Sequence, residues 1–304
     1  MNKIEFGDCR ETMRQWKKQG IKAQTCVTSP PYFGLRDYGH DGQLGLEETP
    51  DEYIKAMVEV FRCVWDVLED DGTLWLNIGD SYCNSNGFAR ASPEYQREGR
   101  NNMPANDRKL DKLHEAGLKT KDLIGIPWML TFALRADGWY LRQDIIWHKP
   151  NPMPESVQDR CTKAHEYIFL LSKSQKYYYD IESIKEPAIY AGDDRGARTD
   201  SRRGTEANSM SGVTGEKRNK RSVWTVTTKP YEGAHFAVFP QDLIEPCIMA
   251  GAPVGGIVLD PFMGSGTTAQ VAQNLGRQYI GCELNPAYME LQNIRTAQQS
   301  LILA

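Results

Sequence analysis

Four consecutive residues near the N-terminus could hold an amino group on a planar base. Ser29, Pro30, Pro31 and Tyr32 follow a short apolar run. The two prolines fix φ and remove two backbone donors, so nearby carbonyls are held rigid and can accept hydrogen bonds from an amine. The tyrosine ring offers a face on which a base can stack. Alone, the tetrad fits a proline-rich turn at a strand end equally well.

A second group of residues, far downstream, has the spacing of a nucleotide-binding turn. An apolar run leads into Asp260, and Gly264, Gly266 and Ala269 follow at the start of a helix-like stretch. Small residues at these positions let the backbone approach a ligand and let the helix pack on the strand. Glu283 ends the next apolar run, about 20 residues after the first glycine, where a carboxylate can bind ribose hydroxyls. Ligand binding is therefore favoured over a purely structural turn.

Together the two groups resemble the DNA amino-methyltransferases that use S-adenosyl-L-methionine. In that family a D-P-F-x-G-S-G-T-T loop binds the cofactor, and a tetrad of Asp, Asn or Ser followed by Pro-Pro-Tyr or Pro-Pro-Phe holds the exocyclic amine. Both patterns occur here without a mismatch. The tetrad comes first and the cofactor loop last, as in the circularly permuted β-class. The resemblance covers most of the chain and implies DNA methylation of the restriction-modification kind by a homodimer, to which apolar residues in 33–38 could contribute.

The predicted fold is α/β, a doubly wound Rossmann-like methyltransferase sheet in permuted order, with loop-rich insertions for DNA recognition. Only a short tail follows Glu283, so the remaining strands must come from the N-terminal half. Residue patterns predict strands at 3–6, 23–27, 73–80, 139–148, 166–172, 258–260 and 279–283, and helices at 10–18, 51–68, 127–136, 241–250 and 269–275.

The resemblance also implies which residues form the site. The catalytic set is Ser29, Pro30, Pro31 and Tyr32. The cofactor set is Asp8, Cys9, Thr28, Phe236, Asp260, Pro261, Phe262, Gly264, Ser265, Gly266, Thr267, Thr268 and Glu283. Asp8 would accept a hydrogen bond from the adenine amine, although a plain turn aspartate fits the local sequence as well. Residues 234–240 would line the methionine end of the cofactor.

The tetrad suggests a mechanism without a covalent enzyme intermediate. The Ser29 side chain and the Pro30 carbonyl would accept from both N–H groups of the amine, favour a more tetrahedral nitrogen and aim its lone pair at the sulfonium methyl. A duplex hides the amine, so the nucleotide must be flipped out and stacked against Tyr32. By family habit Thr-Ser-Pro-Pro-Tyr slightly favours cytosine N4. Adenine N6 is a close second, since serine and aspartate both offer an acceptor.

Pro246-Cys247 is a competing candidate nucleophile. Enzymes that methylate carbon 5 of cytosine use a Pro-Cys thiolate. Here the pair lies in the helix predicted at 241–250, before the cofactor strand, where the order of that family does not place it. Cys247 is therefore predicted to be a core thiol.

Two polar, basic stretches are predicted to face DNA, although the net charge of −4 argues mildly against a nucleic-acid partner. They are a basic insertion at 88–121 and a target-recognition segment at 186–222, set into a catalytic domain formed by 1–185 and 223–304. The predicted DNA-binding residues are Trp147, Lys149, Arg195, Arg198, Arg202, Arg203, Lys217, Arg218, Lys220 and Arg221. For Trp147 and Lys149, a core tryptophan and a surface lysine without DNA contact are equally plausible. For the basic residues in 186–222, the alternative is a solvated flexible loop.

Composition predicts a cytoplasmic enzyme. With 304 residues, of which 40% are hydrophobic and 25% charged, the chain can bury one large core. No apolar stretch approaches the roughly 20 residues needed to span a bilayer, and the polar N-terminus lacks a signal-peptide pattern. The seven cysteines contain no C-x-x-C pair, so no metal site and no disulfide framework are expected.

Other functions remain open on the sequence alone. A nicotinamide-dependent dehydrogenase would use the same glycine turn and Glu283, but it gives no reason for the Ser-Pro-Pro-Tyr tetrad. A methyltransferase acting on RNA or protein is a nearer rival. A DNA-binding module without activity would not need the cofactor loop. Double-stranded DNA is the expected partner and S-adenosyl-L-methionine the expected cofactor.

Overall fold

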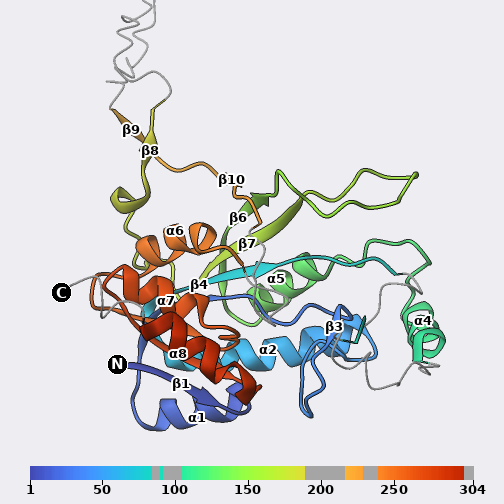
Figure 1. Cartoon of the computed structure of the whole chain (residues 1–304), viewed down its shortest axis with the longest axis horizontal. Coiled ribbons are helices and arrows are strands. Elements are labelled where there is room, and N and C mark those ends of the chain that lie inside the picture. Colours follow the sequence, from blue (N-terminus) through green and yellow to red (C-terminus); the bar gives the residue numbers. More distant parts are fainter. Residues whose placement is uncertain (84–89, 92–104, 189–215, 229–238, 298–304) are drawn as a thin grey trace, which may run out of the picture.

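An eight-stranded sheet positions the candidate site (Figure 1). The computed structural model describes residues 1–83, 90–91, 105–188, 216–228 and 239–297. The strands of the sheet are β1 (Asn2–Phe6), β2 (Ala23–Thr28), β4 (Leu68–Ile78), β6 (Tyr140–His148), β7 (His165–Ser172), β10 (Val223–Thr225), β11 (Ile257–Asp260) and β12 (Gln278–Glu283). Their spatial order is β1-β12-β11-β2-β4-β7-β6-β10. Among them β7 runs antiparallel to its two neighbours, and the other pairs are parallel.

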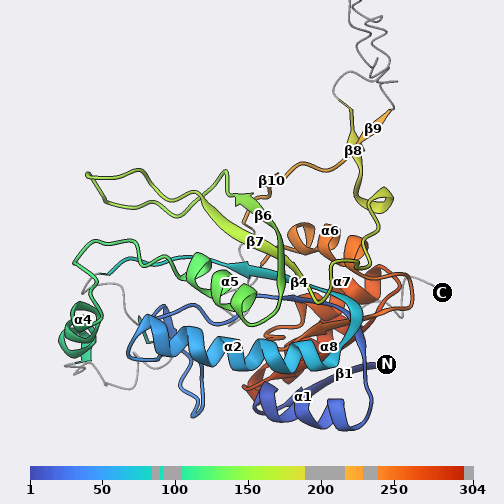
Figure 2. The same ribbon diagram turned by 180° about the vertical axis from the view of Figure 1, so that it is seen from behind.

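Helices cover both faces of this sheet. The helices of the described residues are α1 (Cys9–Lys18), α2 (Pro50–Val67), α4 (Ala105–Glu115), α5 (Ile126–Ala136), α6 (Gln241–Gly251), α7 (Thr267–Asn274) and α8 (Met289–Ala297), with short 3-10 turns at Glu182–Ile184 and Pro286–Tyr288. Of these, α4 lies to one side of the sheet rather than on a face (Figure 1). Buried residues of α1, α2 and α5 form one core cluster with the sheet, and those of α6 and α7 form another. Figure 2 shows α1, α2 and α5 together on one side and α6 on the other. The doubly wound α/β fold predicted from the sequence is confirmed.

The alternation of side chains along β4 shows how one strand supplies both cores. Leu74 and Leu76 are buried in the cluster beneath α1, α2 and α5, whereas Trp75 is buried in the cluster beneath α6 and α7. Successive strand residues point to opposite faces, so a strand covered on both sides is apolar throughout. This explains why the run around Trp75 lacks a polar face.

The strand directions place the tetrad, the glycine loop and Glu283 at the same edge of the sheet. The carboxyl ends of β1, β12, β11, β2 and β4 lie along the same edge, because these neighbours are parallel. The antiparallel strand β7 brings its first residues to that edge, where Tyr167 lies opposite Ile78. In open α/β sheets this edge is where ligands bind.

The main differences from the predicted elements lie in the insertions and directly after the second one. The stretch 88–121 was expected to be loop, but it contains α4, whose Leu113 is fully buried and packs in the core with Leu110 against it. Two leucines three residues apart give that helix an apolar stripe, which the high content of polar residues hides. Strand β10 was not expected, and it extends the sheet beside β6. The pairs β3 (Arg36–Asp37) with β5 (Arg90–Ala91) and β8 (Glu186–Pro187) with β9 (Lys217–Arg218) lie outside the main sheet.

Within the residues that the structure describes, no helix combines the length and the apolar character needed to cross a membrane.

Candidate active site

The tetrad Ser29–Tyr32 leaves the end of β2 and is held in place by α2. The hydroxyl of Tyr53, a fully buried residue in the first turn of α2, donates to the Pro31 carbonyl at 2.9 Å. Phe33, the residue after the tetrad, is also buried, and its ring centroid lies 5.6 Å from that of Tyr53. Helix α2 starts firmly, since Thr49 and Glu52 form a capping box. The backbone of the tetrad is therefore tied to the core.

The polar atoms of the tetrad differ in what they already bind. The Ser29 hydroxyl lies 3.5 Å from the Tyr32 hydroxyl, a weak contact at most. The Tyr32 hydroxyl donates to Glu166 Oε2 at 2.7 Å. Among the described residues, none donates a hydrogen bond to the Pro30 carbonyl. Among the described residues, the Ser29 hydroxyl and the Pro30 carbonyl thus keep the capacity to accept hydrogen bonds, and their role toward an amine stays a prediction.

The glycine loop 264–266 has the backbone conformation that requires glycine. Gly264 has φ +53° and Gly266 has φ +88°, both in the left-handed region. The Gly264 N–H donates to Glu283 Oε2 at 2.7 Å, and the Gly264 carbonyl accepts from Gln292 Nε2 at 2.7 Å. The end of β12 and helix α8 therefore fix the loop from two sides.

Asp260 connects the glycine loop to the tetrad strand. It is 1% exposed and accepts from the hydroxyls of Thr28 and Thr268, each at 2.6 Å, and from the Phe262 N–H at 2.9 Å. Burial raises its pKa to about 6, against the hydrogen bonds that lower it. Thr28 directly precedes Ser29. The predicted cofactor residues Asp260, Thr28 and Thr268 thus bind one another and join the two halves of the site.

Glu283 lies between the glycine loop and the N-terminal turn. Strand β1 pairs with β12, and the Gly7 N–H donates to the Glu283 carbonyl at 2.8 Å. The Glu283 carboxylate also accepts from the Asn285 N–H at 2.8 Å, and burial raises its pKa. These contacts place a partly exposed carboxylate at the edge, beside the residues predicted to hold the adenine.

The Asp8 carboxylate already accepts hydrogen bonds from Arg10. It caps α1 by accepting from the Arg10 N–H at 2.7 Å, and the Arg10 guanidinium binds both of its carboxylate oxygens. The hydrogen bonds from Arg10 lower the pKa of Asp8. Cys9 is buried behind it, and burial raises the pKa of its thiol to about 12. Asp8 therefore stays ionised and has only its remaining lone pairs to offer an amine.

The glycine loop contains one buried polar group that has no hydrogen-bond partner among the described residues. The Ser265 hydroxyl is inaccessible to solvent and has no hydrogen-bond partner within the described ranges. Buried polar atoms are nearly always paired, so such an atom marks a place where a bound molecule can complete the set. With the adjoining positive-φ glycines, the Ser265 hydroxyl and the acceptor oxygens of Glu283 form a set of polar groups that fits a nucleoside cofactor. Pro261 and Phe262 flank the loop, while Thr267 accepts from Arg295. Phe236 lies outside the described residues.

Trp147 and Lys149, predicted to flank a flipped base, have other partners. Trp147 is 4% exposed, belongs to the core beneath α6 and donates from Nε1 to the Val226 carbonyl at 2.8 Å. The Lys149 ammonium lies 4.2 Å from the centroid of the Trp147 ring and forms an ion pair with Glu166. This geometry leaves the Trp147 ring little surface to offer DNA.

In the described part of the predicted target-recognition segment, two arginines bind the same carboxylate. Glu186 of β8 accepts from Arg218 Nε at 3.0 Å and from Arg221 Nε at 2.8 Å. Lys220 lies 5.0 Å from the centroid of the Trp224 ring, and Lys217 is exposed on β9. The β8–β9 pair projects away from the sheet (Figure 1). The remaining predicted contacts, Arg195, Arg198, Arg202 and Arg203, lie outside the described residues.

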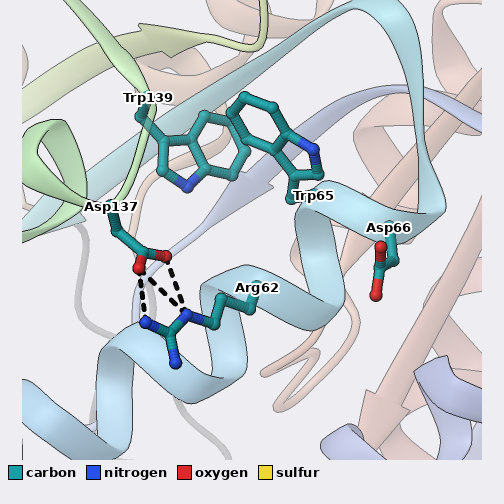
Figure 3. Close-up of a pocket in the computed structure, with 5 residues that line it drawn as sticks. All are labelled: Arg62, Trp65, Asp66, Asp137 and Trp139. Carbon is teal, nitrogen blue, oxygen red and sulfur yellow. Dashed lines mark hydrogen bonds and ion pairs between the residues drawn. The ribbon is translucent and has the colours of Figure 1, made fainter.

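A cavity of about 300 Å³ beside the C-terminal end of α2 is separate from this edge. Its walls include Arg62, Trp65 and Asp137, and Figure 3 shows the guanidinium of Arg62 directed at Asp137. Tyr53, which holds the tetrad, is nine residues earlier on α2, a separation of roughly 14 Å along the helix. The charges of this cavity are already paired, so it is not the candidate site.

Cys247 cannot serve as a nucleophile in this fold. It lies in α6, is fully buried, and donates to the Leu243 carbonyl. Burial raises the pKa of the thiol. The interpretation as a core thiol is confirmed.

Three residues at the site were not predicted from the sequence. Glu166 and Asn77 contact Tyr32, and Gln292 supports the glycine loop. Glu166 and Asn77 are polar residues that adjoin the apolar runs 167–171 and 74–76 of their strands, on the side of the site edge, which is the signal that could have identified them. Gln292 gives no such signal, because a glutamine in an amphipathic helix is normally predicted to be exposed to solvent, whereas Gln292 is buried.

Sequence comparisons identify relatives along nearly the whole chain. The profile of a DNA methylase family, N6_N4_Mtase, matches residues 23–294. Type II methyltransferase M.SmaI of Serratia marcescens is 49% identical over 298 residues, which cover 96% of this chain and 90% of that protein. Type II methyltransferase M.Cfr9I of Citrobacter freundii is 47% identical over 94% of this chain and 84% of its own length.

Solved structures share the fold at lower identity. PvuII DNA methyltransferase, described as cytosine-N4-specific, superposes with a TM-score of 0.63 at 17% identity, over 97% of this chain and 86% of that one. The M1.HpyAVI–SAM complex has a TM-score of 0.56 at 18% identity, over 97% of this chain and all of that one. At these identities the likeness establishes a common architecture.

Proposed function

Because the chain belongs to the N6/N4 family of S-adenosyl-L-methionine-dependent DNA methylases, we propose that it transfers a methyl group to the N4 amino group of cytosine in duplex DNA. Membership in this family excludes the nicotinamide-dependent dehydrogenase. The observation that carries the proposal is the tetrad, whose Ser29 and Pro30 acceptors stay available while Pro31 and Tyr32 are held by the protein.

The choice of cytosine rests on the first residue of the tetrad. Ser29 presents a neutral hydroxyl where the adenine form of the family motif has a carboxylate. The likeness to a solved enzyme described as cytosine-N4-specific agrees with this choice. Adenine N6 is the alternative product that the experiments must distinguish.

The residues of this chain account for binding and orientation of the amine. Ser29 and the Pro30 carbonyl accept from the two N–H groups, which directs the nitrogen lone pair away from the ring plane. The ring of Tyr32 holds the extruded base by stacking. When bound, S-adenosyl-L-methionine supplies an electrophilic methyl group on its sulfonium. By holding the amine in a fixed orientation, Ser29, the Pro30 carbonyl and Tyr32 would supply most of the rate enhancement.

The cofactor would be held along the edge from β1 to β11. Glu283 would bind the ribose hydroxyls, the glycine loop with Ser265 would bind the polar groups of the cofactor, and Asp8 and Cys9 would lie by the adenine. Asp260, Thr28 and Thr268 would act by fixing the loop to β2.

The DNA would lie against the segment 186–222 and the edge that carries the tetrad. We assign target recognition to 186–222 and the catalytic domain to 1–185 with 223–304, interrupted by the basic insertion 88–121. Homodimer formation belongs to the same proposal. In the segment 33–38, Leu35 is the large hydrophobic side chain that is exposed, whereas Phe33 is buried.

A comparison of two alanine variants tests the proposed chemistry. Wild type, Ser29→Ala and Cys247→Ala are incubated with duplex DNA and S-adenosyl-L-methionine carrying a labelled methyl group, and label in DNA is measured. We expect wild type and Cys247→Ala to transfer methyl groups and Ser29→Ala to lose most transfer. Loss of activity in folded Cys247→Ala with retention in Ser29→Ala would instead place the reaction at carbon 5.

A further inference from the structure

A polar cluster lies directly behind the tetrad and has no role in the steps above. Its centre is Glu166, whose Oε2 accepts from the Tyr32 hydroxyl at 2.7 Å. Its other oxygen, Oε1, forms an ion pair with the Lys149 ammonium. The side chains of Glu166 and Lys149 are each 18% exposed. A lysine and a tyrosine from different parts of the chain are therefore bridged by one largely buried carboxylate.

The topology of the sheet explains why Glu166 reaches the tetrad. Glu166 is the second residue of β7, and antiparallel pairing places that end of β7 beside the carboxyl end of β4. On β4, Asn77 donates to the Tyr167 carbonyl at 3.0 Å and lies 3.4 Å from both Glu166 Oε2 and the Tyr32 hydroxyl. The carboxylate is thus fixed by three strands of the sheet, since Lys149 directly follows β6.

Packing restricts the ring of Tyr32, in addition to the hydrogen bond that holds its hydroxyl. A Cβ at Gly79 would lie 2.8 Å from Tyr32 Cε2 and 3.3 Å from Glu166 Cγ. No side chain fits at position 79 while Tyr32 stays where it is. Burial and the nearby charge of Glu166 raise the pKa of Tyr32, so its hydroxyl remains a donor. Both the tip and one edge of the ring are therefore fixed.

We propose that Glu166 is a positioning residue for methyl transfer: held by Lys149, it fixes the Tyr32 hydroxyl and so orients the ring on which the extruded base stacks. The proposal deepens the function proposed above and depends on it. Lys149 then acts through Glu166 rather than by contacting the base. An unfixed tyrosine could turn about its side-chain bonds, and the amine would lose alignment with the methyl group.

A double-mutant cycle on Tyr32→Phe and Glu166→Gln tests this coupling. Tyr32→Phe keeps the stacking ring and removes the hydroxyl, whereas Glu166→Gln removes the charge that Lys149 pairs with. We expect each variant to lower kcat by about 10- to 100-fold, because small misplacements of reacting groups have effects of that size. The KM for S-adenosyl-L-methionine should stay within about twofold of wild type, and the double variant should be no slower than the slower single variant.

Glu5 offers a matched control. Like Glu166, it accepts from an aromatic side chain, Trp16 Nε1 at 2.9 Å, and pairs with a lysine, Lys3, at 2.5 Å, but it lies on β1. Glu5→Gln should retain the wild-type kcat. Wild-type kcat in Glu166→Gln, or independent effects of the two substitutions in the cycle, would overturn the proposal. If Glu166→Gln does not fold, Tyr32→Phe alone decides, since wild-type kcat in that variant contradicts the role of the hydroxyl.

The same preparations separate this inference from the proposed function. If wild type methylates adenine, the cycle is measured on adenine, and only the base assignment fails. If wild type transfers no methyl group to DNA, the proposed function fails and this inference fails with it.

Discussion

At the scale of single residues, the site depends on which acceptors are occupied and which are left. Pro31 and Tyr32 are bound by the protein, whereas the Ser29 hydroxyl has only a 3.5 Å contact. Because this contact is weak, it does not compete strongly with a hydrogen bond from an amine to the Ser29 hydroxyl. Among the described residues, the tetrad therefore combines a rigid support with two acceptors that have no strong hydrogen bond, the Ser29 hydroxyl and the Pro30 carbonyl.

Substitution of Ser29 by alanine should affect the reaction more than cofactor binding. We expect Ser29→Ala to lower kcat by about 100-fold, the usual effect of removing one hydrogen-bonding group that acts in the transition state. The dissociation constant for S-adenosylhomocysteine, measured by calorimetry, should stay near that of wild type. A large loss of cofactor affinity with an unchanged kcat would contradict the role given to Ser29.

Asp260 should make stability depend on pH in an unusual direction. Its pKa is raised from 3.8 to about 6 in the folded protein, so the folded state favours the protonated form. Such a group contributes stability below the unfolded pKa and loses it as pH rises through the folded pKa, here a loss of about 3 kcal/mol. The contribution of Asp260 to the free energy of unfolding, measured by urea titration as the difference between wild type and a variant that cannot ionise there, should therefore fall between about pH 4 and pH 6.

The variant Asp260→Asn isolates this contribution. Asparagine keeps the size of the side chain and an oxygen that accepts from Thr28, but it does not ionise. The free energy of unfolding of wild type minus that of Asp260→Asn should therefore decrease between about pH 4 and pH 6. Parallel curves for the two proteins would show that Asp260 does not titrate as described.

At the scale of elements, the glycine loop depends on a helix that follows it in the chain. Gln292 of α8 is buried and donates to the Gly264 carbonyl at 2.7 Å. We expect Gln292→Ala to weaken cofactor binding by about tenfold, which corresponds to about 1.4 kcal/mol for one lost hydrogen bond in a buried site. Calorimetric titration with S-adenosylhomocysteine measures this effect.

The neighbouring Asn293 provides the control for that experiment. It lies on the same helix but is exposed, so Asn293→Ala should bind the cofactor as wild type does. Equal losses in both variants would mean that α8 as a whole, rather than the contact of Gln292 with the loop, is responsible.

Local sequence patterns predicted most helices and strands. The features that could not be predicted depend on contacts between residues far apart in the sequence. The tetrad and the glycine loop are runs of adjacent residues, so their shape follows from proline and glycine geometry. The partner of Tyr32 is 134 positions away at Glu166, which only the antiparallel direction of β7 reveals. Helix α4 was missed because its two apolar positions are few among polar residues. Burial of Trp147, likewise, depends on β10 and α6.

At the scale of the whole molecule, the mildly negative net charge of −4 makes the location of basic residues important for DNA binding. Arg218 and Arg221 lie on the projecting β8–β9 arm and its continuation, held by Glu186. Contacts to phosphates release counterions, so affinity falls with salt in proportion to the number of contacts.

We expect the variant with both Arg218→Ala and Arg221→Ala to bind duplex DNA more weakly and with a smaller salt dependence. The slope of log affinity against log salt should decrease by about 1 to 2, measured by fluorescence anisotropy. Arg62→Ala is the control, since Arg62 is likewise paired with a carboxylate but lies beside the cavity in Figure 3. An unchanged slope in the double variant would remove these arginines from the DNA surface.

The identity of the methylated nucleoside tests the central claim most directly. Duplex DNA is incubated with the protein and S-adenosyl-L-methionine carrying a labelled methyl group, then digested to nucleosides and separated by liquid chromatography with mass detection. The proposed function predicts label in N4-methylcytosine. Label in N6-methyladenine would contradict the assignment to cytosine, and label in 5-methylcytosine or in no nucleoside would contradict transfer to an exocyclic amine by the Ser29–Tyr32 tetrad.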